Sequence, residues 1–168
     1  TATGSLGVDI ASTSYDVLNV SGAYAIAGKL DVKVLGAFDP AQGQTFTVLN
    51  YGTGTTGTFT IADNRADYDF TASYTGTGLT LTAHVIDQTL TGGTGNDVLL
   101  GGAGNDTFKA SAGNDTIQTG AGLDTFEIGA GFEIEGAKMV GDNLVFTYSS
   151  RLDASLHTTT ILNHTAGS

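Results

Sequence analysis

The stretch GGTGNDVLLGGAGNDTFKASAGNDTIQTGAGLDTFE, residues 92–127, consists of four consecutive nine-residue blocks. The blocks begin at Gly92, Gly101, Ala110 and Thr119, and the sixth position of each block is an aspartate. Two positions after each aspartate stands an apolar residue, so every block ends in a short segment with one hydrophobic side chain. Four blocks in strict register predict a repetitive, coiled architecture rather than a set of unrelated turns.

The aspartates of the blocks are candidate calcium ligands. Calcium takes about six to eight oxygens from carboxylates and carbonyls, so one aspartate per turn is too few and turns must share an ion. A turn that aims its carbonyls at an ion needs unusual backbone angles, which glycine adopts at the least steric cost. The aspartates are Asp97, Asp106, Asp115 and Asp124, and the second and fourth positions hold Gly93, Gly95, Gly102, Gly104, Ser111, Gly113, Gly120 and Gly122.

In glycine spacing, aspartate position and apolar position, the blocks resemble the nonapeptide repeats of the RTX family. The resemblance implies a β-roll in which six residues of each block form a turn, three form a strand, and two blocks complete a right-handed coil. Turns eighteen residues apart would then stack. Asp97 would share a calcium ion with the turn of Asp115, and Asp106 with the turn of Asp124, which makes two ions.

The frame continues past the fourth block as IGAGFEIEG, residues 128–136, where Glu133 takes the place of the aspartate. A third ion between the turns of Asp115 and Glu133 is left open, because Glu135 occupies the apolar position and breaks the pattern. Upstream, residues 83–91 keep only Leu90 in frame and lack the turn glycines, so we expect the roll to begin near Thr91.

The rest of the chain reads as short strands separated by glycine turns, without a helical period, and this predicts an all-β protein. Residues 15–59 resemble the end of a β-helix from autotransporter-like bacterial surface proteins. We therefore expect a right-handed parallel β-solenoid with a β-helix-like leader (1–90), an RTX β-roll (91–136) and C-terminal capping strands that include a hairpin (137–168). A β-sandwich leader followed by a β-roll is the alternative.

Composition narrows the class of partner. The 168 residues include 17 acidic and 6 basic ones, a net charge of −11, which argues against nucleic acid or an anionic membrane. There are no cysteines, so we expect a bound metal rather than a disulfide to stabilise the fold. No apolar run reaches the length of a membrane-spanning helix, and residues 1–10 lack the pattern of a signal peptide.

No arrangement of residues points to catalysis. His84, His157 and His164 occur without a zinc-protease motif or a serine elbow. Asp67 and Asp69 have strand spacing, which suits either a glycosidase-like pair or a solvated face, and we favour the solvated face. The sequence therefore predicts a protein that is not an enzyme.

These features favour a non-catalytic, calcium-dependent structural module of a secreted bacterial RTX protein, such as an adhesin, exoprotein or S-layer-like component, which folds on calcium after export. The resemblance implies type I secretion and an extracellular or cell-surface location. The alternative is a C-terminal accessory module of a secreted polysaccharide lyase or epimerase, lipase or protease. Calcium is the expected partner, and cell-surface polysaccharide or self-association is left open.

Overall fold

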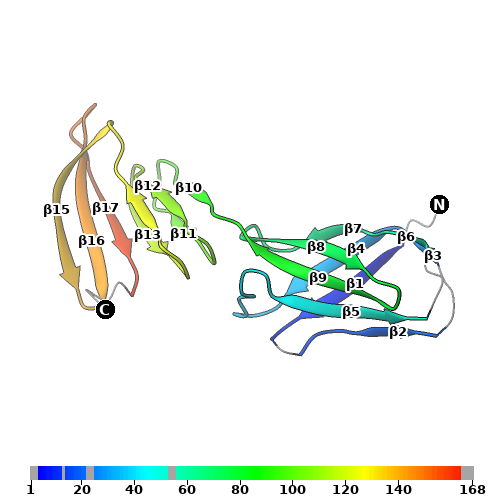
Figure 1. Cartoon of the computed structure of the whole chain (residues 1–168). Helices are drawn as coiled ribbons and strands as arrows, with labels where there is room; N and C mark the ends of the chain where they lie inside the picture. Colours follow the sequence, from blue (N-terminus) through cyan, green and yellow to red (C-terminus); the bar gives the residue numbers. More distant parts are fainter. Residues whose placement is uncertain (1–3, 13, 22–24, 53–55, 164–168) are drawn as a thin grey trace. The chain divides into compact units, whose positions relative to one another are not determined.

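The computed structural model describes residues 4–12, 14–21, 25–52 and 56–163, and all of their regular structure is β (Figure 1). The chain divides into two compact units, Thr1–Ile86 and Asp87–Ser168. This boundary lies upstream of the predicted one at residue 90, because strand β10 (Thr89–Thr91) already pairs with a strand of the second unit. No helix in the described part of the chain is long and apolar enough to cross a membrane.

The first unit is built from parallel coils with an antiparallel end. Its strands are β1 (Ser5–Ile10), β2 (Leu18–Val20), β3 (Ala25–Ile26), β4 (Lys29–Val34), β5 (Thr45–Tyr51), β6 (Thr56–Gly57), β7 (Thr60–Asp63), β8 (Tyr68–Tyr74) and β9 (Gly78–Val85). Strand β4 pairs in parallel with β1 and β7, β5 pairs with β2, and β6 pairs with β3. The chain therefore runs through three sheets in the same order twice.

Strands β8 and β9 interrupt this coiling as an antiparallel hairpin, and β9 pairs antiparallel with β5. The first unit is therefore not a continuous parallel solenoid, and its likeness to autotransporter β-helices stays a prediction. Alternate side chains of β4 and β9 are buried in the core of this unit. These side chains are Leu30, Val32, Val34, Leu79, Leu81 and Ala83.

The second unit contains the repeats. Its strands are β10 (Thr89–Thr91), β11 (Val98–Leu100), β12 (Thr107–Lys109), β13 (Asn114–Gln118), β14 (Thr125–Glu127), β15 (Phe132–Val140), β16 (Asn143–Ser150) and β17 (Leu156–Ile161). One sheet has the order β10-β12-β14 and the other the order β11-β13-β17-β16-β15. The repeat strands pair in parallel with partners eighteen residues away, as in the pairs Leu90↔Phe108, Leu99↔Ile117 and Phe108↔Phe126.

The apolar residue of each block points into a thin core between the two sheets. Phe108 and Ile117 are almost fully buried, and Leu99 and Phe126 are partly buried against them. Two side chains of the last strands, Ile161 and Phe146, complete this core. The apolar position that recurs in every block therefore faces the interior of the roll.

The roll ends in a three-stranded cap formed by β15, β16 and β17. Strands β15 and β16 form an antiparallel hairpin through Gly141 and Asp142, as the sequence predicts. Strand β17 returns and pairs in parallel with β13, so the cap continues that sheet (Figure 1). Because β15 already begins at Phe132, the cap starts before the predicted boundary at residue 136.

Candidate calcium-binding turns

The turns of the roll stack in two columns, with eighteen residues between stacked turns. In the first column, turn 92–97 lies against turn 110–115, and Asn114 N donates to Asn96 Oδ1 at 2.8 Å. In the second column, turn 101–106 lies against turn 119–124, and Leu123 N donates to Asn105 Oδ1 at 2.9 Å. These are the pairs of turns that the resemblance to RTX repeats implies.

Each column links its two aspartates directly. Asp97 N donates to Asp115 Oδ1 at 3.1 Å, and Asp106 N donates to Asp124 Oδ1 at 3.0 Å. Asp115 is 3% exposed and no lysine or arginine of the described residues forms an ion pair with it. A buried carboxylate is costly unless its charge is compensated, so this column favours a bound cation.

Oxygens from both turns of a column converge at its leading glycine. A Cβ at Gly92 would overlap Ser111 Oγ and lie 2.7 Å from Asp97 Oδ2. A Cβ at Gly101 would overlap the carbonyl oxygen of Thr119 and the carboxylate of Asp106. Such oxygen-rich cradles, assembled from two turns, fit the donor set of calcium.

Each column can therefore be assigned its own set of candidate ligands. Asp97, Ser111 and Asp115 would hold an ion in the first column, and Asp106, Thr119 and Asp124 would hold one in the second. No group of three histidine or acidic side chains stands together among the described residues. Calcium also takes backbone carbonyls, and those of the glycine turns would complete both sets.

The predicted turn glycines fall into two groups. Gly102, Gly104, Gly113, Gly120 and Gly122 have positive φ angles between 88° and 132°, a region that glycine enters without strain. A Cβ on Gly113, Gly120 or Gly122 would also overlap the carbonyl oxygen of the glycine eighteen residues earlier. Gly95 has open space around its Cα, and Gly93 donates its N–H to Asp97 Oδ2 at 2.6 Å.

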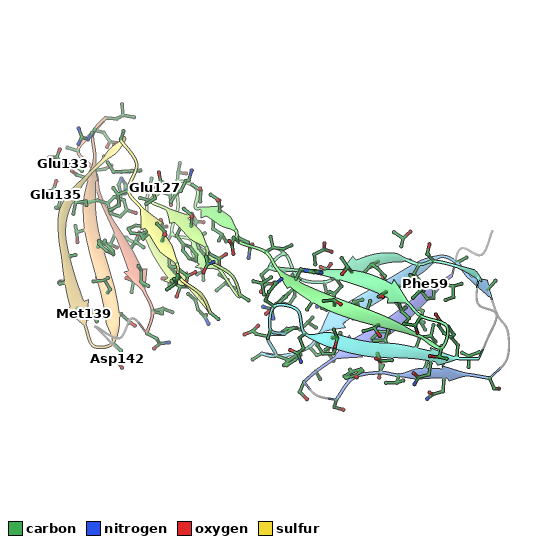
Figure 2. The ribbon with its side chains drawn as sticks, in the orientation of Figure 1. Phe59, Glu127, Glu133, Glu135, Met139 and Asp142 are labelled. Atoms are coloured by element: carbon green, nitrogen blue, oxygen red, sulfur yellow. The ribbon has the colours of Figure 1, made fainter. Side chains whose placement is uncertain are left out.

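The expected role of Glu133 is corrected by the structure. Glu133 lies exposed on β15, where it pairs with Ser149, and β17 and β16 separate this strand from β13 (Figure 2). The place next to turn 110–115 is taken by β17, with Thr158 opposite Asn114. Residues 128–136 therefore do not form a further coil, and a third ion between the turns of Asp115 and Glu133 has no site.

One turn was missed in the sequence because it lacks glycine. Asn105 N donates to Asp87 Oδ1 at 2.7 Å, and Gln88 N donates to Asp106 Oδ1 at 2.8 Å. Both contacts span eighteen residues, so residues 87 and 88 form the first turn of the second column. Gln88 Nε2 donates to the carbonyl oxygen of Gly101 at 2.6 Å. The spacing, together with the in-frame Leu90, was the available signal.

His157 is a structural residue in this fold. Its Nδ1 accepts a hydrogen bond from Gly113 N at 2.9 Å, so in the neutral ring the proton sits on Nε2. Nε2 then donates to Ser155 Oγ at 3.0 Å, and Ser155 Oγ donates to Asp153 Oδ1 at 2.6 Å. These hydrogen bonds fix the imidazole between turn 110–115 and Ser155. His164 lies outside the described residues.

Asp67 and Asp69 do not form a carboxylate pair on a solvated face. Asp67 is buried and accepts a hydrogen bond from Arg65 Nε at 2.8 Å, while Asp69 is exposed on β8. The guanidinium of Arg65 also lies 5.0 Å from the centre of the Tyr68 ring. The expectation of a shared solvated face is therefore wrong for Asp67, because a nearby arginine compensates its charge in the interior.

Residues 87–117 and 100–132 match the family model of the RTX calcium-binding nonapeptide repeat. Comparison with curated proteins and with solved structures finds no significant match. The family match covers both turn columns and begins at Asp87, the residue at which the second compact unit starts. It therefore agrees with the missed first turn as well as with the four blocks that the sequence reveals.

Proposed function

Because residues 87–132 are RTX calcium-binding repeats, we propose that this chain is a non-catalytic module whose second unit folds when it binds calcium. The observation that carries the proposal is the direct contact between stacked aspartates, Asp97 with Asp115 and Asp106 with Asp124. RTX repeats are typical of proteins exported by type I secretion. We therefore assign the module to a secreted or cell-surface protein, with an adhesin or exoprotein as its parent.

Electrostatics supports a folding switch. Ten of the 17 acidic residues, but only three of the 6 basic ones, lie in the second unit. Stacking the turns brings carboxylates of the same charge together, and the glycine-rich backbone loses much conformational entropy when it orders. Calcium neutralises the carboxylates, so its binding free energy becomes folding free energy. At low cytosolic calcium the repeats would stay unfolded, and they would fold outside the cell.

The first unit has the opposite character. Its core of Phe46, Tyr68, Phe70 and the alternating residues of β4 and β9 is apolar and contains no repeat aspartate. We therefore expect this unit to keep its structure when calcium is removed. The two units thus provide an internal comparison within one chain.

Hydrogen exchange of the full chain tests the proposal. With calcium, amides of residues 87–132 should be protected, and a chelator should remove this protection while the amides of β4, β5 and β9 stay protected. Magnesium at the same concentration is the control, because it demands a smaller octahedral shell and dehydrates reluctantly. Unchanged protection of the repeats after chelation, or equal loss in both units, would refute a calcium-driven fold of the second unit.

The absence of catalysis is a separate part of the proposal. The lone pair of His157 is engaged by Gly113 N, and Asp67 is held by Arg65, so neither is a ready acid or base. We expect no turnover of polysaccharides or esters by the purified chain. Turnover that a single substitution in this chain abolishes would overturn this part alone.

A further inference from the structure

The two calcium-binding columns end differently. In the first column, turn 110–115 is enclosed between turn 92–97 and the cap, and Ser111 and Asp115 are only 5% and 3% exposed. In the second column, turn 119–124 has a stacked partner on one side only. Leu123 in this turn is 86% exposed, and the turn lines an open cleft beside Phe126.

The cap makes hydrogen bonds along the whole of turn 110–115. Tyr148 Oη donates to the carbonyl oxygen of Ser111 at 2.9 Å, and Gly113 N donates to His157 Nδ1 at 2.9 Å. Thr158 N donates to the carbonyl oxygen of Gly113 at 3.1 Å. Thr158 Oγ1 donates to Asn114 Oδ1 at 2.9 Å. No hydrogen bond from the described residues of the cap reaches turn 119–124.

Tyr148 and His157, which form hydrogen bonds with turn 110–115, are themselves held in place by packing. Tyr148 is fully buried, and its ring packs edge-on against Phe132 with centroids 5.2 Å apart. The His157 ring also packs edge-on against Phe132 at 5.8 Å, and Ser155 anchors its Nε2. The donors and acceptors that face the turn therefore keep fixed positions.

We propose that Tyr148 and His157 are positioning residues that pre-order turn 110–115, so that the Asp97–Asp115 site fills at lower calcium than the Asp106–Asp124 site. This inference rests on the proposed function, since it concerns the order in which calcium folds the repeats. A turn already ordered by protein contacts gives up less conformational entropy on binding an ion and therefore binds it more tightly. Turn 119–124 is held by turn 101–106 but lacks the contacts of the cap, so a larger share of its ordering must come from the ion.

The cap also stands where another coil would stack. In the first column, the positions beyond turn 110–115 that a further aspartate turn would fill are occupied by His157 and Thr158 of β17. The cap therefore replaces a neighbouring turn with hydrogen-bonding groups of β17. It terminates the column while keeping the last turn in its stacked form.

Calcium titration of the full chain, followed by hydrogen exchange or amide chemical shifts, tests the inference. Residues 110–115 should reach half of their maximal response at about tenfold lower calcium than residues 119–124. Tyr148→Phe removes one hydrogen bond to turn 110–115. The calcium concentration at which residues 110–115 reach half of their response should then rise about five- to tenfold, closer to the value for residues 119–124. Ser149→Ala is the matched control, because Ser149 contacts Glu135 on β15 and should leave both responses unchanged.

Coincident or reversed responses of the two turns in the unaltered chain would overturn the inference, even if Tyr148→Phe does not fold. An unchanged ratio between the calcium midpoints of the two turns in a folded Tyr148→Phe variant would also overturn the inference. Both outcomes still include calcium-dependent ordering and leave the proposed function intact. If neither turn responds to calcium, the proposed function fails instead.

Discussion

Alanine at Gly113 should disrupt the first calcium-binding column, whereas alanine at Gly95 should not. The two glycines hold the same motif position in blocks that are eighteen residues apart. Gly113 has a φ of +111°, and a Cβ there would overlap the carbonyl oxygen of Gly95 and lie 2.6 Å from its carbonyl carbon. Real Cβ atoms essentially never come closer than 3.0 Å to such atoms, so the two turns must separate. A Cβ on Gly95 meets nothing within 4 Å.

The magnitude follows from the contacts that separation breaks. An alanine in the left-handed region costs about 1–2 kcal/mol. Loss of the bonds from Asn114 N to Asn96 Oδ1 and from Asp97 N to Asp115 Oδ1 costs about 1 kcal/mol each. The total of about 3–4 kcal/mol is large for the second unit, since domains of this size have roughly 4–12 kcal/mol of stability.

Denaturant unfolding at saturating calcium, read from hydrogen exchange of the repeat amides, measures this difference. Gly113→Ala should lower the free energy of unfolding of the second unit by about 3–4 kcal/mol. Gly95→Ala should change it by less than about 1 kcal/mol, because its main effect is on the entropy of the unfolded chain. Equal stabilities for the two variants would show that the turns are not stacked as described.

Three further predictions concern single side chains. Asp115→Ala should weaken calcium-dependent folding more than Asp124→Ala, because Asp115 is the more deeply enclosed; equal calcium titration midpoints would contradict this. Arg65→Met should lower the free energy of unfolding of the first unit by about 3–5 kcal/mol because it removes the charged partner of the buried Asp67 carboxylate, and denaturant melts would show it. Burial raises the pKa of Tyr68 to about 12 from 10.0, so first-unit stability should fall as pH rises from 10 to 12, where only the unfolded state ionises. The described residues offer no hydrogen-bond partner to the buried Tyr68 hydroxyl, so Tyr68→Phe should abolish this alkaline loss without lowering stability at pH 7, as melts across pH would reveal.

The repeat architecture could be predicted from the sequence because the residues of each block specify their own local structure. Glycine and aspartate in a turn, followed by one apolar residue in a strand, are local chemistry that recurs every nine residues. The eighteen-residue pairing of turns is what the resemblance to RTX repeats implies, and the structure has it, with Phe108 and Ile117 in the core of the roll. The all-β class and a hairpin within residues 137–168 could also be predicted, because short strands and glycine turns are local patterns in the sequence.

The ends of the roll were decided by tertiary structure. Whether residues 128–136 form another turn depends on competition between a fifth glycine-rich coil and the hairpin of β15 and β16, which packs Phe132 on Tyr148. The hairpin prevails, so Glu133 leaves the column. At the other end, Asp87 and Gln88 join the column without any glycine, because hydrogen bonds to Asn105 and Asp106 hold them there.

Tertiary structure also distinguishes residues that the motif makes equivalent. Gly95 and Gly113 occupy identical positions in their blocks, yet only Gly113 lies against the carbonyl group of a preceding turn. Asp115 and Asp124 are likewise identical in the repeat, but the cap covers only the turn of Asp115. A repeat specifies the contacts between neighbouring copies, whereas the last copy in each column takes its environment from whatever part of the chain returns to cover it.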